Sequence, residues 1–271
     1  AATVDRFAPD VIVSSLSRSR FAARVVTRWK SIPHVECFVG DDYSPARLAT
    51  LSRSEKRRAR LVKLADRSSS WAFERGIALS QHLKKEVSRS LGVCSDRIVV
   101  LPRGRDPSHY QGWDRAVIRR QLDVPENAPV LISVGRLVPQ KGMDVLIRAV
   151  ERVKAHVPTV RLLIAGDGEQ SAMLERLASA LGLESNVKFL GSRADIPQLL
   201  AAADVFALAT RFEGFGGVFA EAMMSSLPIV ASDIPVAREL VEPGRNGLLT
   251  GPEDAGAFAD ALIELLRSPD R

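Results

Sequence analysis

The feature that most constrains the fold is an alternation of short apolar runs with amphipathic stretches along most of the chain. Apolar runs such as residues 130–134 and 205–208 are typical of buried strands, and the stretches between them follow helical periodicity. Strands that alternate with helices in this way form βαβ units, in which the strands lie parallel. The sequence therefore predicts an α/β protein in which helices pack on parallel sheets.

The alternation occurs in two series. In the first series we expect strands at 10–14, 33–39, 76–80 and 97–101, and helices at 20–29, 50–70 and 82–91, with Gly92 ending the last helix. In the second series we expect strands at 130–134, 160–164, 187–190, 205–208 and 229–231. The helices expected there are 143–156, 170–181, 196–202, 217–225 and 254–267.

Between the two series, residues 102–112 are rich in Pro, Gly, Asp and Ser, a composition typical of an interdomain linker. We therefore predict two domains, at 1–108 and 109–271. Four strands are few for an open parallel sheet, and the chain begins at Ala1 directly before a strand-like segment. We expect the first domain to be incomplete at its start.

Charge is distributed unevenly along the chain. Residues 1–110 carry a net charge of +10, whereas residues 111–271 carry −4. Much of the positive excess comes from a basic run within the helix expected at 50–70, formed by Arg53, Lys56, Arg57, Arg58, Arg60, Lys63 and Arg67. This run is typical of a solvated helix face, and it also fits a patch for an anionic acceptor or an anionic membrane surface. Nucleic acid is not predicted as a partner, because no aromatic residues are interleaved with these bases.

The two cysteines, Cys37 and Cys94, lie far apart, and neither belongs to a CxxC pair. A disulfide framework and a structural metal site are therefore not expected, which favours a reducing compartment. The sequence contains no run of 18 apolar residues, so no membrane-spanning helix is predicted. These features predict a cytoplasmic protein, with peripheral contact at the inner face of the membrane as an open alternative.

The first motif is the segment 135–142, which follows an expected strand and precedes an expected helix. Ligands of open α/β sheets bind beyond the carboxyl ends of the strands. Arg136 and Lys141, beside Gly135, could both reach one diphosphate, Arg through a planar fork and Lys as a point charge. The alternative is a strand-to-helix turn with two exposed bases. The segment is not a Walker A loop, because Lys141 precedes its glycine and no Ser or Thr follows.

The second motif, Gly166-Asp167-Gly168, resembles the start of a dinucleotide-binding fingerprint but has Ser171 where a third glycine would stand. A plain turn is the favoured interpretation.

The third motif runs from Glu213 to Glu221 and contains three glycines. The glycines favour a loop that approaches a ligand closely, followed by a helix that begins near Gly217 and presents backbone N–H groups to a phosphate. Carboxylates beside such a loop are strong acceptors for sugar and ribose hydroxyls. The alternative is a glycine turn with two surface glutamates.

Together these motifs resemble a known family. The order GRL-x3-KG, GDG, VKFLG, ADVF-x3-T-x2-EGFG-x4-EAM, LPIVASD and ELV-x4-NGLL is similar to that of the retaining glycosyltransferases of the GT-B fold, in particular family 4. Glu213 and Glu221 match the E-x7-E motif of that family. The resemblance is strong over 130–267 and weak over 8–108. It implies two Rossmann-like domains, a nucleotide-sugar donor, a glycan, lipid or small-molecule acceptor, and no cofactor.

The resemblance also implies roles for individual residues. Arg136 and Lys141 would bind the donor diphosphate, and Glu221 would accept hydrogen bonds from the ribose. Glu213 would contact hydroxyls of the donor sugar, while backbone N–H groups of Phe215 and Gly216 would bind the sugar or phosphate. Residues Leu190 and Gly191 would lie against the base. No metal is expected, because cationic side chains and a helix N-terminus would stabilise the leaving diphosphate.

The sequence departs from the family pattern at two positions of the donor half. Ser226 stands where Gly is usual, at a cost of about 1 kcal/mol if that residue needs a positive φ. Gly217 stands where an aliphatic residue is usual, which weakens a helix start by roughly 0.5–1 kcal/mol unless the glycine is a cap.

A third departure concerns the acceptor side, where the family often has a His at the position of Val39. His34 lies five residues earlier and would face the opposite side of the strand. We interpret His34, His82, His109 and His156 as surface or structural residues. Asp41 and Asp42 are the candidate substitutes.

The sequence thus predicts a retaining transferase that moves a hexose from a nucleoside-diphosphate sugar to an acceptor hydroxyl. Two alternatives stay open. A sugar-nucleotide epimerase could use the same architecture, although the E-x7-E motif argues against it. A catalytically silent sugar-nucleotide-binding module would fit the absence of His at Val39.

Overall fold

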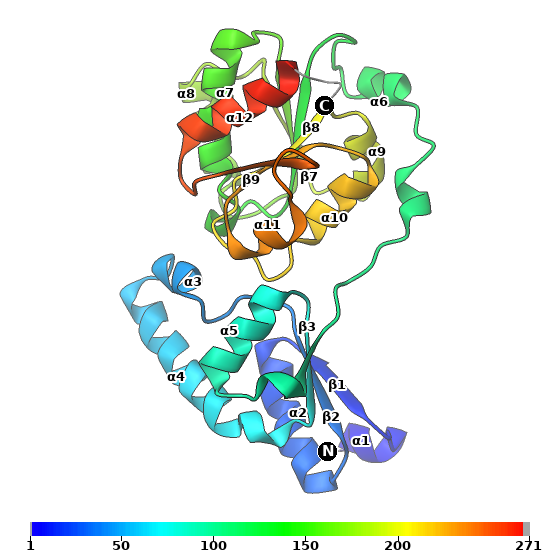
Figure 1. Ribbon diagram of the computed structural model, residues 1–271, viewed down its shortest axis with the longest axis vertical. Helices are drawn as coiled ribbons and strands as arrows, with labels where there is room; N and C mark the ends of the chain where they lie inside the picture. The colour runs from blue at the N-terminus through cyan, green and yellow to red at the C-terminus, as the bar shows by residue number, and fades with distance from the viewer. Residues whose placement is uncertain (1, 268–271) are drawn as a thin grey trace. The chain divides into compact units, whose positions relative to one another are not determined.

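The structure, a computed structural model, describes residues 2–267. The chain divides into two compact units (Figure 1). The first unit comprises the residues up to Arg103 together with the short segment Glu213–Phe215, and the second comprises the other residues from Gly104 on. Each unit contains one sheet, and all paired strands in both sheets are parallel. The predicted α/β class with two parallel sheets is therefore confirmed.

The sheet of the first unit has the strand order β1-β2-β3-β4. Its strands are β1 (Ile12–Ser15), β2 (His34–Phe38), β3 (Arg75–Ala78) and β4 (Ile98–Val100). Side chains alternate along β2, where His34, Glu36 and Phe38 are buried and the residues between them are only partly covered. Val13 and Val99, on the less covered face, are exposed.

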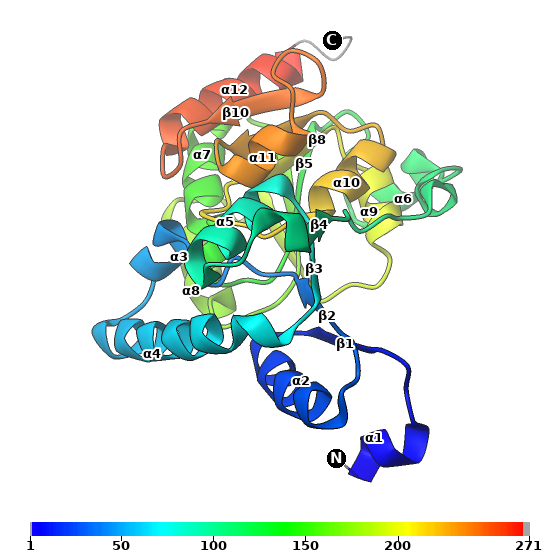
Figure 2. The ribbon, with the colours of Figure 1, turned by 60° about the horizontal axis from the view of Figure 1, so that its bottom comes forward.

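Helices cover one face of this sheet. The helices of the unit are α1 (Ala2–Phe7), α2 (Ser17–Lys30), α3 (Pro45–Ala49), α4 (Arg53–Ser69) and α5 (Gln81–Leu91). Helix α2 packs on β1 and β2, α5 packs on β3 and β4, and α4 packs against both helices (Figures 1 and 2). Gly92 ends α5 in a left-handed conformation with φ of 69°, as predicted.

The single helix predicted roughly over 50–70 is confirmed as α4, and only its first residue differs, since α4 begins at Arg53. Ser52 and Glu55 form a reciprocal capping box that fixes this start. The short helix α3, which precedes it, was not predicted. The short helix α1 was not predicted.

The sheet of the second unit has six strands in the order β10-β9-β8-β5-β6-β7. The strands are β5 (Val130–Val134), β6 (Arg161–Ala165), β7 (Val187–Gly191), β8 (Val205–Leu208), β9 (Ile229–Ser232) and β10 (Gly247–Thr250). Five of them lie where the sequence predicted them. The edge strand β10 was missed, because its four residues are flanked by polar turns and only partly buried.

The helices of the second unit are α6 (Arg115–Gln121), α7 (Met143–His156), α8 (Ser171–Ala180), α9 (Ile196–Ala201), α10 (Gly217–Met224), α11 (Pro235–Leu240) and α12 (Ala255–Arg267). Helices α7 and α12 pack against each other on one face of the sheet, while α9 and α10 lie on the other (Figure 1). Because both faces are covered, every residue of β5, β8 and β9 is buried. Helices α6 and α11 were not predicted.

Among the residues that the structure describes, no helix combines the length and the apolar character needed to cross a bilayer.

Candidate functional site

The order of the strands marks one edge of the second sheet as a ligand site. From β5 the chain builds outward through β6 and β7, then returns to place β8 on the opposite side of β5. Neighbouring strands at such a reversal send their following loops in opposite directions, which leaves a crevice at their carboxyl ends. The loops that follow β5 and β8 are residues 135–142 and 209–216, which carry the first and third sequence motifs.

Lys141 lies across the start of the first loop. Its side chain passes so close to Gly135 that a Cβ there would lie 3.3 Å from the Lys141 Cε atom. Gly142 has a φ of +61°, and a Cβ at this residue would overlap the carbonyl oxygen of Ala209. Arg136 is exposed in the same loop. The structure therefore brings Gly135, Arg136 and Lys141 together at the carboxyl end of β5.

The second motif packs against this loop and hydrogen-bonds to its backbone. Backbone N–H of Leu137 donates to the carbonyl of Asp167 at 2.9 Å, and backbone N–H of Gln170 donates to the carbonyl of Leu137 at 3.0 Å. A Cβ at Gly168 would lie 2.4 Å from the carbonyl oxygen of Leu137. The glycines of Gly166-Asp167-Gly168 thus allow two loop backbones to pack closely, which agrees with the interpretation as a turn.

Arg211, which the sequence analysis did not single out, ties the two loops together. Its backbone N–H donates to the carbonyl of Gln140 at 2.8 Å, and its Nη2 atom lies 2.9 Å from Asp144 Oδ2 and from Glu253 Oε2. The Gln140 side chain donates to the carbonyl of Phe212 at 2.9 Å. Arg211 and its partners therefore hold the 135–142 loop against the loop after β8.

The third motif forms a loop that leads into α10. Gly216 is the N-cap residue, with a left-handed backbone at φ 66° and ψ 55°, and the helix begins at Gly217 as predicted. Glu221 lies about one turn into the helix. Glu213 is buried and groups with Gly214 and Phe215 in the first unit.

Glu221 has a partner that the sequence did not predict. Its Oε1 atom accepts a hydrogen bond from Arg105 Nε at 3.0 Å. Arg105 also lies near Tyr110, and burial together with the Glu221 charge raises the pKa of that phenol. Arg105 belongs to the stretch that we had interpreted only as a linker.

Leu190 and Gly191 stand at the end of β7. Gly191 has a φ of 66°, and its carbonyl accepts a hydrogen bond from the backbone N–H of Gly166 at 2.8 Å. This bond connects the end of β7 to the turn after β6. The 190–191 segment therefore lies at the same carboxyl edge as the first loop.

The two departures of the donor half have structural consequences. Ser226 has a φ of 55°, so it occupies the left-handed conformation in which the family usually has Gly. Its backbone N–H still donates to the carbonyl of Met223 at 2.9 Å, which closes the end of α10. Gly217 is the first residue of the helix and not its cap, so it does not recover the cost of lacking a side chain there.

The four histidines have separate environments, His34 and His82 in the first unit and His109 and His156 in the second. His34 is fully buried, its Nε2 atom lies 2.8 Å from Ser14 Oγ, and burial lowers its pKa. His109 and His156 are exposed. His82, at the start of α5, lies with its Nε2 atom 3.2 Å from Asp41 Oδ2.

The two candidate substitutes for the missing His differ in their contacts. Asp41 is buried, and its Oδ1 atom has no hydrogen-bond partner among the described residues. Asp42 pairs with Arg20 at 3.4 Å, and burial raises the pKa of its carboxyl. Val39 stands where the family often has a His. The Asp41–His82 pair nevertheless places an imidazole at the carboxyl end of the first sheet.

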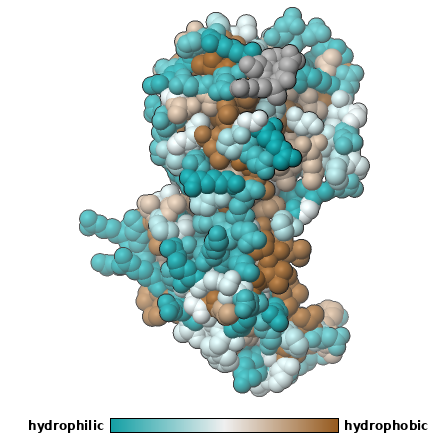
Figure 3. Space-filling view, viewed as in Figure 1, coloured by the Kyte–Doolittle hydropathy of each residue, from teal (hydrophilic) through white to brown (hydrophobic). Residues whose placement is uncertain are grey.

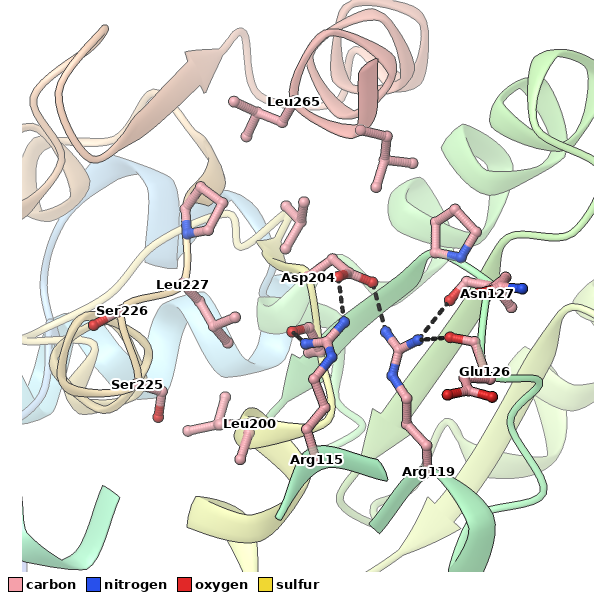
Figure 4. Close-up of a pocket in the computed structure, with 17 residues that line it drawn as sticks. Arg115, Arg119, Glu126, Asn127, Leu200, Asp204, Ser225, Ser226, Leu227 and Leu265 are labelled. Atoms are coloured by element: carbon pink, nitrogen blue, oxygen red, sulfur yellow. Dashed lines mark hydrogen bonds and ion pairs between the residues drawn. The ribbon is translucent and has the colours of Figure 1, made fainter. Parts of the chain in front are cut away.

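A pocket of about 590 Å³ opens at the opposite edge of the second sheet, at the amino ends of β5, β8 and β9 (Figure 4). The carboxylate of Asp204 in this pocket is already hydrogen-bonded by the protein. Asp204 accepts hydrogen bonds from the side chains of Arg115 and Arg119 and from the backbone N–H of Val130. This network explains the aspartate of the ADVF segment as a structural residue, and the pocket lies away from the loops described above.

Comparison with known proteins identifies the class of the protein. Residues 114–271 match the family Glycosyl transferases group 1. The chain belongs to this family.

Individual relatives agree with this assignment. The lipopolysaccharide core biosynthesis glycosyltransferase LpsE of Rhizobium meliloti is 37% identical over 161 residues, which are 59% of this chain and 46% of LpsE. A GDP-mannose-dependent phosphatidylinositol monomannoside mannosyltransferase of Corynebacterium glutamicum is 38% identical over 63% of this chain and 47% of its own length. The chain thus matches about half the length of these curated relatives.

Among solved structures, Anabaena Alr3699/HepE in complex with UDP is similar with a TM-score of 0.83 and 32% identity. The similarity covers 99% of this chain and 72% of HepE. A further structure of HepE contains UDP-glucose and gives the same TM-score and identity over 96% of this chain.

Proposed function

We propose that the protein is a retaining hexosyltransferase that uses a nucleoside-diphosphate sugar as donor and a hydroxyl of a glycan, lipid or small molecule as acceptor. The observation that carries this proposal is the position of the two motif loops. The cationic loop with Arg136 and Lys141 and the helix with Glu221 follow β5 and β8, which are adjacent strands at the reversal of the sheet. In one donor molecule a diphosphate is joined to a ribose. Cationic side chains bind the diphosphate and a carboxylate binds the ribose hydroxyls, so the two kinds of side chain must lie side by side.

Each residue has a proposed role. Arg136 and Lys141 bind the diphosphate and offset the charge that develops on it as the sugar leaves. The left-handed turn at Gly216 and the start of α10 direct backbone N–H groups, including that of Phe215, toward the sugar and phosphate. Glu221 binds the ribose hydroxyls and Glu213 the sugar hydroxyls. Leu190 and Gly191 flank the base.

No metal is part of the proposal. Two cationic side chains and a helix N-terminus supply the positive charge that a divalent cation supplies in other phosphate sites. We propose retention at the anomeric carbon because Glu213 and Glu221 match the E-x7-E motif, and the acceptor then approaches the same face of the sugar that the diphosphate leaves.

We further propose that residues 109–271 form the donor domain and residues 1–108 the acceptor-side domain. The UDP and UDP-glucose complexes of HepE support a nucleotide-sugar donor for this family member as well. We place the protein in the cytoplasm, with peripheral contact at the inner face of the membrane.

A panel of UDP-, GDP- and ADP-sugars in a thermal-shift assay identifies the donor, and the selected sugar nucleotide is then titrated into two variants. Glu221→Gln should weaken the binding of both the free nucleoside diphosphate and the nucleotide sugar. Glu213→Gln should leave the affinity for the free nucleotide unchanged and lower kcat, because its contact matters most as charge develops on the sugar ring. Gln keeps the size and one acceptor of Glu while it removes the charge.

Three outcomes would contradict parts of the proposal. Equal loss of free-nucleotide affinity in both variants would end the division of roles. Release of an epimerised donor in NMR spectra would indicate the epimerase. Tight donor binding without turnover for any acceptor would indicate a silent binding module.

A further inference from the structure

Helix α4 exposes leucines where a helix of a soluble domain exposes polar residues. Arg57, Leu61 and Leu64 recur at spacings of four and three residues and therefore lie on one side of the helix. Leu61 is 69% exposed and Leu64 is 64% exposed, while Asp66 on the inner side is fully buried. The helix thus points a charge inward and two leucines outward.

The apolar surface continues beyond the end of α4. Trp71, seven residues after Leu64, is 64% exposed, and the guanidinium carbon of Arg28 on α2 lies 5.7 Å from the centre of its ring. Leu61, Leu64 and Trp71 are called the docking face below. Exposed apolar residues that gather in this way mark an interaction surface.

Bases without acidic partners flank the docking face. Arg53, Arg57, Arg58 and Arg60 are exposed, and none of them forms an ion pair with a carboxylate within residues 2–267. No Asp or Glu occurs between residues 56 and 65. Long hydrophilic side chains project from the end of the first unit that carries α3 and α4 (Figure 3), and the first turns of α4 extend beyond α5 (Figure 2). The uncompensated positive charge attracts an anionic partner.

The combination of groups selects the kind of partner. A soluble anionic glycan can pair with the bases and stack on a tryptophan ring, but it offers no apolar layer in which Leu61 and Leu64 would be buried. An anionic membrane offers both a layer of negative headgroups and an apolar region beneath it. Tryptophan rings favour the boundary between these layers, and arginine side chains reach from it to the headgroups.

We propose that the docking face, on α4 and just after it, binds the surface of an anionic lipid bilayer, with Leu61, Leu64 and Trp71 inserted below the headgroups and the α4 arginines paired with lipid phosphates. This inference deepens the membrane contact of the proposed function and rests on it for the biological setting, but it needs no donor and no sugar transfer.

Co-sedimentation of the full 271-residue chain with vesicles tests the inference. Vesicles of phosphatidylcholine mixed with phosphatidylglycerol should bind the protein, and vesicles of phosphatidylcholine alone should not. The double variants Leu61→Ser with Leu64→Ser and Arg57→Gln with Arg60→Gln should each lower the apparent affinity by about tenfold or more. All four residues are exposed, so these variants keep the core intact.

Matched controls use exposed residues elsewhere. Val99→Ser with Leu101→Ser removes two exposed apolar residues of the first unit, and Arg148→Gln with Arg176→Gln removes two exposed charges of the second. Both controls should bind vesicles like the wild type. Vesicle binding should also shift the emission of Trp71 to shorter wavelength in a background that carries Trp29→Phe and Trp113→Phe.

Equal binding to neutral and anionic vesicles, or wild-type binding by both docking-face variants, would overturn the inference. Binding that is lost in the arginine variant, unchanged in the leucine variant and competed by a soluble polyanion such as heparin would replace it with an anionic-acceptor site. Because none of these assays contains a donor, their failure leaves the proposed sugar transfer to be judged by its own assay.

Discussion

The cores of the two units are built from different residues. The core of the second unit is a large apolar cluster that includes Leu131, Ile147, Phe206 and Leu262, all fully buried. The first unit has a much smaller apolar cluster around Phe38 and Phe73, and beside it lies a set of buried charges. The second unit is therefore held mainly by non-directional burial, whereas the first depends on directional contacts that tolerate few substitutions.

The buried charges of the first unit form one network. Arg24 binds Glu36 through two hydrogen bonds of 2.5 and 2.7 Å, and its Nη1 atom lies 2.6 Å from Asp66 Oδ1. Asp66 also contacts Arg20 at 3.1 Å and accepts a hydrogen bond from the Tyr43 hydroxyl at 2.8 Å. The network joins α2, β2 and α4, so it holds the basic helix in place. Burial and the Asp66 charge raise the pKa of Tyr43 far above its ordinary value.

The largest expected effect follows from cutting this network. Arg24→Met leaves Glu36 and Asp66 buried without their main cation, which should lower the free energy of unfolding of the first unit by about 3–5 kcal/mol. Arg115→Met in the second unit should cost only about 0–1 kcal/mol, because that arginine is 42% exposed. Urea unfolding followed by tryptophan fluorescence measures both variants.

Similar losses in the two variants would remove the contrast between the cores. Arg24→Met combined with Glu36→Leu should recover part of the loss, since it removes the unpaired carboxylate as well.

The second prediction concerns the cationic loop of the second unit. Arg136→Ala and Lys141→Ala should each weaken binding of the free nucleoside diphosphate by about 1.5–3 kcal/mol, the range for hydrogen bonds to charged groups. Isothermal titration measures the affinity, with Arg148→Ala, an exposed arginine on α7, as the control. Unchanged affinity in both loop variants would remove this loop from the phosphate site and leave it a turn with two exposed bases.

A smaller effect is expected from Arg211, which contacts the 135–142 loop through the carbonyl of Gln140. Arg211→Gln should weaken nucleoside-diphosphate binding by about 1 kcal/mol, because the 135–142 loop loses its connection to the loop after β8. Arg211→Lys should restore only part of this affinity, since lysine lacks the planar fork. Arg245→Gln, which breaks the exposed pair with Glu242, is the control.

For Arg211→Gln, the nucleotide affinity is compared with the melting temperature, because a positioning role lowers the affinity whereas a purely structural role lowers only the melting temperature. If Arg211→Gln lowers the melting temperature but binds the nucleotide like the wild type, the arginine has a structural role alone.

The smallest effect is expected at the end of α10. Ser226→Gly should stabilise the second unit by about 1 kcal/mol, because glycine adopts the left-handed conformation without steric cost. Its neighbour Ser225 has a φ of −87°, so Ser225→Gly should destabilise instead. Differential scanning calorimetry of both variants gives the sign of each change. A destabilised Ser226→Gly would show that the turn requires the serine side chain.

Much of the fold could be predicted because its elements are periodic. Strands such as β5 and helices such as α7 lie at the predicted residues, since their burial leaves a clear apolar pattern. Elements that depend on local capping or on partial burial could not be placed this way. The start of α4 depends on the Ser52–Glu55 box, and β10 is a short edge strand.

The candidate site was less predictable from the sequence than the fold. Glycine-rich motifs after strands predicted the loops that lie at the carboxyl edge of the second sheet, because glycine allows close backbone approach. Contacts between distant residues left no such signal. Arg211 with Asp144 and Arg105 with Glu221 are separated by many residues in the chain and meet only in the folded unit. The buried network around Arg24 was also hidden, because charged residues in a sequence are ordinarily read as surface.

The central claim is that a nucleotide sugar binds at the carboxyl edge of the second sheet. Hydrogen–deuterium exchange of the full chain, with and without a saturating nucleotide sugar from the donor panel, tests it most directly. The account predicts slower exchange in the 135–142 loop and in residues 213–221, and unchanged exchange in α6 and the rest of the opposite-edge pocket. Protection confined to that pocket, or no protection of either loop at saturation, would contradict it.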